Sequence, residues 1–168
     1  LAMVDGAQSF GSMEVDLHSI GCDFYTGSAH KWFLGPREAG VLYVNESMVE
    51  HLWATHVGVG WESAVRSGAR KFEVLGQRDD AAVAAVATTV RFHETVGKQR
   101  VAERVSELAS ALKDGLGARI PGTHFHTPSS AEFSGGVVVF LPPGSDAREL
   151  VTALYEEHGV AGAAMGGA

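Results

Sequence analysis

The sequence feature that most constrains the fold is a short aromatic run that stops at a turn of small and polar residues. The run is Cys22-Asp23-Phe24-Tyr25, and its brevity and aromatic content favour a buried strand. The turn that follows is Thr26-Gly27-Ser28-Ala29-His30-Lys31-Trp32, which offers a hydroxyl, an imidazole and an amine. Because ligands of open α/β sheets bind at the carboxyl ends of the strands, this turn is a candidate functional site.

A second apolar segment, at the start of the chain, ends in a similar way. It runs into Asp5, and Gln8 follows three positions later. Neighbouring parallel strands have their carboxyl ends at one edge of the sheet. We therefore expect Asp5 and Gln8 to lie close to Ser28, His30 and Lys31.

The two turns together resemble the cofactor site of class V aminotransferases. D-G-A-Q at 5–8 is followed by S-A-H-K at 28–31, so that Lys31 lies 26 positions after Asp5. The likeness continues through residues 35–44 and is weaker at 76–79. These proteins are fold-type-I enzymes that use pyridoxal 5'-phosphate (PLP), and they include cysteine desulfurases and isopenicillin N epimerases. The resemblance implies an α/β fold, with part of the large mixed-sheet domain at 1–97 and part of the small C-terminal α/β domain at 98–168.

The resemblance assigns the central chemistry to Lys31 and Asp5. Lys31 would hold the cofactor's aldehyde as a Schiff base, and its freed amine would remove or return the α-proton of an amino acid. Asp5 would pair with the pyridine nitrogen, because a nearby anion favours the protonated ring. The protonated ring is what draws electrons from the α-carbon of the substrate.

Four further residues would bind the cofactor. Gln8 would donate its amide to the phenolic oxygen, and Ser28 and His30 would bind the phosphate, since hydroxyl and imidazole N–H groups donate to anionic oxygens. In the family, a threonine that follows a glycine contacts the phosphate from the partner subunit. This chain has Gly76-Gln77 at that point, so Gln77 is the candidate for the contact, through an amide in place of a hydroxyl.

The resemblance implies a PLP-dependent enzyme that acts on an amino acid at its α-carbon, similar to the epimerase and aminotransferase members. Transamination, epimerisation and β-elimination stay open, as does a non-catalytic α/β module for binding or oligomerisation. A cysteine desulfurase or C–S lyase is a further alternative, but Cys22 precedes the lysine and does not match the late-loop thiol of desulfurases. Family members are usually dimers with shared sites, which implies a homodimer.

Composition narrows the partners of the chain. Its 168 residues carry a net charge of −7, and its 13 Lys and Arg residues form no cluster, which argues against a nucleic-acid partner. No apolar stretch of the sequence reaches the roughly 18 residues that span a bilayer. The single cysteine excludes an internal disulfide and agrees with a cytoplasmic location. His124 and His126 share one face of a predicted strand, but no carboxylate or thiol joins them, so we predict no metal site.

Hydrophobic periodicity predicts an alternation of strands and helices. Strands are expected at 22–26, 39–44, 124–127, 136–141 and near Val160, with the one at 39–44 antiparallel or at an edge. Helices are expected at 15–20, 46–53, 79–96, 98–116 and 146–158, and residues 54–75 keep no period. The chain opens inside an apparent core strand, so we expect it to be part of a longer protein and the isolated 168-residue piece to have no useful turnover.

The two long helices carry different apolar faces. In the helix at 79–96 the face consists mostly of small residues: Ala82, Ala85, Val86, Thr89, Val90 and His93. In the helix at 98–116 the stripe consists of larger ones: Val101, Val105, Leu108, Leu112 and Leu116. We expect both faces to pack against other elements.

Overall fold

The computed structural model describes residues 1–165, so the last three residues of the predicted domain at 98–168 lie outside the described residues. The chain forms two compact units, Leu1–Val105 and a second that starts at Ser106, and the division falls within a long helix. Compactness alone does not define a family's domains. The predicted bounds of 1–97 and 98–168 therefore stay a prediction.

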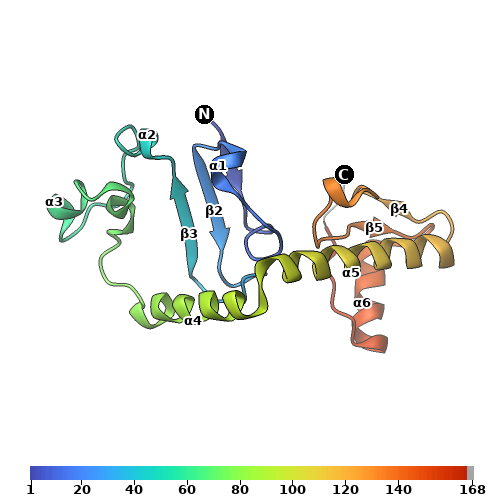
Figure 1. Cartoon of the computed structure of the whole chain (residues 1–168). Coiled ribbons are helices and arrows are strands. Elements are labelled where there is room, and N and C mark those ends of the chain that lie inside the picture. The colour runs from blue at the N-terminus through green and yellow to red at the C-terminus, as the bar shows by residue number, and fades with distance from the viewer. Residues whose placement is uncertain (166–168) are drawn as a thin grey trace. The chain divides into compact units, whose positions relative to one another are not determined.

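Both units contain strands and helices (Figure 1). The first unit contains β1 (Met3–Asp5), α1 (Leu17–Ile20), β2 (Phe24–Ser28), β3 (Gly40–Val44), α2 (Glu46–Val49), α3 (Trp61–Ala64), the 3-10 helix η1 (Gly68–Glu73) and α4 (Asp80–Val96). The division falls within α5 (Lys98–Arg119), which is followed by β4 (His124–Phe125), the 3-10 helix η2 (Ala131–Phe133), β5 (Phe140–Leu141) and α6 (Ala147–His158).

The first unit is built on a three-stranded sheet in which β2 lies between β1 and β3 (Figure 1). β1 runs parallel to β2, with Asp5 opposite Thr26, and β3 runs antiparallel to β2, with Tyr43 opposite Tyr25. The connection from β2 to β3 is too short for the crossover that a parallel strand requires. The expected pairing of the first two strands and the antiparallel edge position of the third are therefore confirmed.

β1 is an edge strand with exposed apolar side chains, so the core position expected for it is wrong. Met3 is 68% exposed, and only Val4 of the strand residues is partly covered. Among the strands described in residues 1–165, β1 pairs with β2 alone, and its side chains point to the faces of the sheet, where Met3 stays exposed. The buried side chains of the sheet are Tyr25 on β2 and Val44 on β3.

Gly6 allows the D-G-A-Q turn to pass close against the ring of Tyr25. Gly6 N donates to Thr26 O at 2.7 Å, which extends the parallel ladder. A Cβ atom at position 6 would lie 2.0 Å from Tyr25 Cζ, far inside contact distance, so only glycine fits. The Tyr25 hydroxyl donates to Gly6 O at 3.4 Å and lies 3.0 Å from Ser9 Oγ. A buried tyrosine thus anchors this turn to β2.

The long helices begin at the residues that the sequence marks. Asp79 caps α4 by accepting hydrogen bonds from Ala81 N at 3.0 Å and Ala82 N at 3.1 Å, and Gly97 follows its last turn. Asp146 caps α6 in the same way. α5 runs past its predicted end, because glycine weakens a helix without breaking it.

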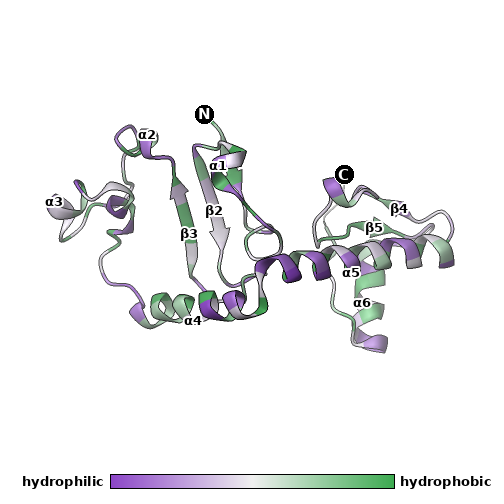
Figure 2. Cartoon of the chain, viewed as in Figure 1, coloured by the Kyte–Doolittle hydropathy of each residue, from purple (hydrophilic) through white to green (hydrophobic). Residues whose placement is uncertain are grey.

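The small-residue face of α4 is only partly covered. Thr89 is buried and His93 is half-buried, whereas Val90 is 41% exposed. Figure 2 shows hydrophobic segments of α4 in green between hydrophilic ones. The expected packing of this face is therefore confirmed at Thr89 and His93 and fails at Val90.

Several predicted elements are shorter than expected. The helix at 46–53 forms only as α2, and the strands at 124–127 and 136–141 pair only as β4 and β5. Residues 54–75 contain α3 and η1, which are too short to show a period. Among the helices of residues 1–165, none combines the length and apolar content needed to cross a bilayer.

The strand expected near Val160 does not form. Gly159 takes a left-handed conformation with φ of 65°, and its N–H donates to Tyr155 O at 3.0 Å. Val160 N donates to Leu154 O at 2.9 Å. Both N–H groups therefore turn back onto the last carbonyls of α6 and are not available to pair with a strand.

In the second unit, the predicted apolar stripe of α5 is confirmed at Leu116, which is half-buried, and fails at two other leucines. The predicted stripe includes Leu108 and Leu112, which are 51% and 45% exposed. The structure instead buries Ala109 and Lys113, which lie one helical turn apart. A lysine can occupy such a position because its long stem is apolar, provided that its ammonium finds acceptors.

Lys113 meets this condition with oxygens from a single loop. Its Nζ donates to Pro128 O at 2.8 Å, to Ser129 O at 3.1 Å and to Ser134 Oγ at 3.0 Å. All three ammonium protons thus have acceptors. Lys113 thus ties the loop between β4 and β5 to α5.

We predict that Lys113→Met lowers the free energy of unfolding by about 2–4 kcal/mol, because hydrogen bonds to charged groups contribute roughly 1.5–3 kcal/mol each. Methionine keeps an apolar stem but leaves the loop oxygens without their donor. Urea denaturation of the intact protein measures the change. Lys98→Met is the control, since Lys98 is exposed and its ammonium pairs with Glu14 Oε1 at 3.8 Å, and the substitution should cost less than about 0.5 kcal/mol. Equal stability of the two variants would contradict the role of the Lys113 ammonium.

The two histidines of the second unit lie together. The rings of His124 and His126 meet edge-on, with centroids 4.4 Å apart. Within residues 1–165, no group of three or more potential metal-ligating side chains gathers anywhere. The structure thus shows the two histidines in a ring contact, with His124 in β4 and His126 directly after it.

Candidate functional site

Both candidate turns lie at one edge of the sheet. Asp5 ends β1 and stands opposite Thr26 of β2, and β2 itself ends at Ser28. Asp5 is exposed, and its Oδ1 accepts a hydrogen bond from Ala7 N at 2.9 Å, which closes the turn. The two parallel strands thus carry a carboxylate and a hydroxyl at neighbouring carboxyl ends.

The two turns are joined directly through Trp32, the residue after Lys31. The indole Nε1 of Trp32 donates to Gln8 Oε1 at 2.8 Å, across 24 positions of sequence. The backbone of Gln8 is also held, because the hydroxyl of the buried Ser12 donates to Gln8 O at 2.8 Å. Gln8 therefore lies beside the lysine turn, as the sequence predicts.

The lysine turn is tightly wound. Leu34 N donates to Lys31 O at 2.9 Å, and Gly35 N donates to Ala29 O at 2.6 Å. Leu34 has a φ of 60°, a left-handed conformation that costs a non-glycine residue roughly 1–2 kcal/mol. Backbone strain of this kind persists only where the surrounding contacts hold it. Lys31, which is half-buried, thus sits in a backbone of fixed conformation.

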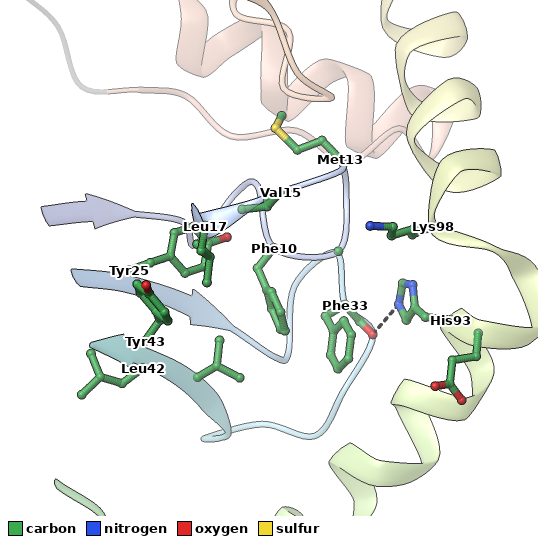
Figure 3. A pocket seen from close by; sticks show the side chains of 13 residues that line it. Phe10, Met13, Val15, Leu17, Tyr25, Phe33, Leu42, Tyr43, His93 and Lys98 are labelled. Carbon is green, nitrogen blue, oxygen red and sulfur yellow. Dashed lines mark hydrogen bonds between the residues drawn. The ribbon is translucent and has the colours of Figure 1, made fainter. Parts of the chain in front are cut away.

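His93 of α4 supports the far end of this turn. Its Nε2 donates to Phe33 O at 2.9 Å (Figure 3), and its ring stacks on the Phe33 ring with centroids 4.7 Å apart and planes 5° from parallel. Because a carbonyl oxygen only accepts, Nε2 carries a proton. Phe33 packs in turn on Phe10, with ring centroids 4.4 Å apart. A helix 60 positions further along the chain thus fixes the residue two places after Lys31.

The remaining predicted residues differ in their surroundings. Ser28 is half-buried and His30 is exposed, and both lie in the same turn as Lys31. Gln77 is exposed in the segment before α4 and, in the part of the chain that the structure describes, makes no hydrogen bond to the residues of the sheet edge. Its contact with a partner subunit stays a prediction.

An apolar pocket of about 730 Å³ occupies another part of the first unit (Figure 3). Its lining is mostly aromatic and aliphatic and includes none of the predicted site residues. Successive side chains of a strand point to opposite faces, so Ser28 lies on the face of β2 away from Tyr25, which lines the pocket. The pocket is therefore separate from the candidate site. Three lining residues also support the candidate site: Phe33 and His93 hold the lysine turn, and Tyr25 anchors the turn after β1.

The side chains at the sheet edge fit PLP. This cofactor takes a carboxylate at its ring nitrogen, a donor at its phenolic oxygen, donors at its phosphate and an amine at its aldehyde. Asp5, Gln8, Ser28, His30 and Lys31 supply these four kinds of group at one edge.

Trp32 and His93 are supporting residues that the sequence did not single out. A half-buried indole N–H needs an acceptor, so a tryptophan directly after the lysine is a usable signal for a nearby polar side chain. No local pattern links His93 to Phe33, because their contact depends on where α4 packs.

Comparison with known proteins agrees with this arrangement. The family model for Aminotransferase class-V matches residues 1–167. The chain is 36% identical over 168 residues to an isopenicillin N epimerase of Streptomyces clavuligerus, a match that covers 92% of this chain and 42% of that relative. The chain thus spans about two-fifths of the length of this relative.

Solved structures share the fold. A cysteine desulfurase from Thermococcus onnurineus NA1 superposes with a TM-score of 0.82 at 27% identity, over 95% of this chain and 40% of that one. The C-DES protein, solved with glycine covalently linked to its PLP cofactor, gives a TM-score of 0.75 at 25% identity, over 90% of this chain and 41% of that one. These likenesses confirm the expected fold-type-I α/β architecture. The chain belongs to the aminotransferase class-V family of PLP-dependent enzymes.

Proposed function

We propose that the intact protein is a PLP-dependent enzyme that acts at the α-carbon of an amino acid, as an epimerase or aminotransferase. The observation that carries this proposal is the parallel register of β1 and β2, which puts Asp5 and the lysine turn at one sheet edge. The bond from Trp32 to Gln8 supports it, because it ties the two turns together. Membership of the family supplies the class of reaction.

Bound at this edge, the cofactor supplies an electron sink for the bonds at the α-carbon of the substrate. Lys31 would hold the cofactor through Nζ, and the same atom, as a free amine, would take up or return the α-proton. Asp5 keeps a proton on the ring nitrogen, since a carboxylate stabilises a neighbouring positive charge.

Three other side chains bind and orient. Gln8 donates an amide N–H to the phenolic oxygen. Ser28 Oγ and a ring N–H of His30 donate to the phosphate, where hydrogen bonds to a charged acceptor are stronger than neutral ones.

Cys22 is not placed to act as the thiol of a cysteine desulfurase. It is the one cysteine of the sequence, it is 1% exposed, and it precedes β2, whereas Lys31 follows β2. The five residues of β2 span roughly 16 Å, so this thiol does not reach a substrate held at Lys31. A desulfurase reaction would require a thiol from outside this chain.

The proposal includes a homodimer in the cytoplasm. Gln77 is exposed and follows Gly76, whose φ is 82°. In the proposed dimer, the side-chain amide of Gln77 donates to a phosphate held by the second copy. Analytical ultracentrifugation of the intact protein tests the dimer. A monomer at micromolar concentrations would contradict it.

Spectroscopy of the intact protein tests the proposed function. We expect added PLP to give a visible absorbance band, and at least one amino acid to change that band. Exchange of the α-hydrogen with solvent deuterium then identifies an epimerase, and release of a keto acid identifies an aminotransferase. A protein that stays colourless in excess PLP would instead support the non-catalytic α/β module.

A further inference from the structure

We propose that Trp32 is a positioning residue that sets the direction of the Gln8 carboxamide, so that Gln8 presents its NH2 group to the cofactor and not its oxygen. The proposal rests on the proposed function, in which Gln8 is the donor to the phenolic oxygen. Its structural basis is the hydrogen bond from Trp32 Nε1 to Gln8 Oε1 at 2.8 Å.

This hydrogen bond decides which end of the amide faces which way. A carboxamide has an acceptor oxygen and a donor NH2 of nearly equal size, so shape alone does not choose between its two orientations. An indole N–H is a donor only, and therefore the amide oxygen is the end that faces Trp32. The NH2 group occupies the other branch of the amide and is directed away from the indole.

The backbone of Gln8 is fixed, whereas its side chain is exposed and is held by Trp32. The backbone is held by the bond from the buried Ser12 hydroxyl to Gln8 O at 2.8 Å. Trp32 is covalently next to Lys31, and the phenolic oxygen and the aldehyde of PLP are on adjacent ring positions. One dipeptide, Lys31-Trp32, thus sets both the amine for the aldehyde and the donor for the neighbouring oxygen.

A pH titration of the visible absorbance of PLP bound to Lys31 measures the effect. A donor to the phenolic oxygen stabilises its anion and lowers the pH midpoint at which the bound chromophore loses its proton. We expect Trp32→Phe to raise this midpoint by about 0.5–1 pH unit, since phenylalanine fills the space but leaves the amide able to turn. Trp53→Phe is the matched control, because Trp53 is exposed and its ring lies beside that of Trp61, with centroids 5.7 Å apart. This substitution should leave the midpoint unchanged.

A double-mutant cycle separates orientation of the amide from a general loss of packing. Gln8→Ala removes the donor and should raise the midpoint at least as much as Trp32→Phe does. In the Gln8→Ala background, adding Trp32→Phe should change the midpoint by less than about 0.2 pH unit, because the group that the indole orients is gone. A full-sized shift in that background would overturn the proposal, and so would an unshifted midpoint in Trp32→Phe alone.

The indole Nε1–H NMR resonance of Trp32 gives a readout that needs no cofactor. In protein with isotope-labelled tryptophan, the resonance is assigned by its loss in Trp32→Phe. Gln8→Glu keeps an oxygen acceptor and should leave the resonance near its hydrogen-bonded position, whereas Gln8→Ala should move it upfield. An unchanged resonance in Gln8→Ala would contradict the hydrogen bond itself.

Failure of the proposed function has a different signature from failure of this inference. If the unmutated intact protein shows no visible band with PLP, the proposed function is wrong and the role of Trp32 is wrong with it. If the band forms but Trp32→Phe titrates like the unmutated protein, the enzyme assignment stands and only the positioning role is wrong.

Discussion

Replacing Lys31 with alanine lowers the kcat of the intact enzyme by at least about 10²–10⁴-fold, the range that a positioned proton-transfer group contributes. The variant also loses the covalent attachment of PLP, which adds to the loss. Alanine should not disturb the turn, because the hydrogen bond made by residue 31, from Leu34 N at 2.9 Å, uses its backbone oxygen. Steady-state kinetics measure the loss of kcat. Circular dichroism tests whether the fold is retained, and we expect an unchanged spectrum.

The control for this prediction is Lys98→Ala. Lys98 is exposed, pairs with Glu14 at 3.8 Å and lines the apolar pocket instead of the candidate site. The kcat of the Lys98→Ala enzyme should stay within about twofold of the unmutated value, because surface substitutions usually have small effects. Added methylamine should restore part of the turnover of Lys31→Ala, since it supplies the missing amine. A Lys31→Ala enzyme with unmutated kcat would contradict the assignment.

Replacing Asp5 with asparagine lowers kcat by about 10²–10³-fold, the cost of removing one well-placed electrostatic group. In the unmutated protein, Ala7 N donates to Asp5 Oδ1 at 2.9 Å. Asparagine keeps an Oδ1 acceptor for this bond, so the turn is retained and only the charge is lost. Without that charge the ring nitrogen loses its proton near neutral pH, and the ring accepts electrons less well. Measurement of kcat at neutral pH, with saturating PLP, isolates this effect from weaker binding.

A matched control and a rescue accompany this prediction. Asp16→Asn changes the N-cap of α1, whose Oδ1 accepts from His18 N at 3.0 Å, and asparagine caps about as well as aspartate, so kcat should not change. A PLP analogue methylated at the ring nitrogen carries a permanent charge and should restore part of the turnover of Asp5→Asn. An Asp5→Asn enzyme with unmutated kcat would show that the carboxylate does not face the ring nitrogen.

The position of the candidate site is predictable from sequence because it depends on where two strands end. Asp5 is the last residue of β1, as the sequence indicates, whereas β2 runs from Phe24 to Ser28, two residues later at both ends than the predicted strand at 22–26. The caps of α4 and α6 are predictable for a similar reason, since Asp79 and Asp146 bond only to the backbone that follows them. Each of these features depends on residues that are neighbours in the sequence, so the sequence alone is enough to predict it.

The features that the sequence does not predict depend on distant neighbours. The contact of His93 with Phe33 exists only because α4 packs beside the lysine turn. Lys113 is buried because a later loop presents three oxygens to it, and periodicity cannot register such a partner. Met3 stays exposed on a face of the sheet, although the composition of β1 is that of a core strand.

Borohydride reduction of the intact protein with bound PLP, followed by digestion and peptide mapping, tests the central assignment most directly. We predict a stable label on Nζ of Lys31, at about one label per chain, because one amine at the sheet edge holds the cofactor. A label on another lysine, or a coloured protein that takes no label, would contradict the account.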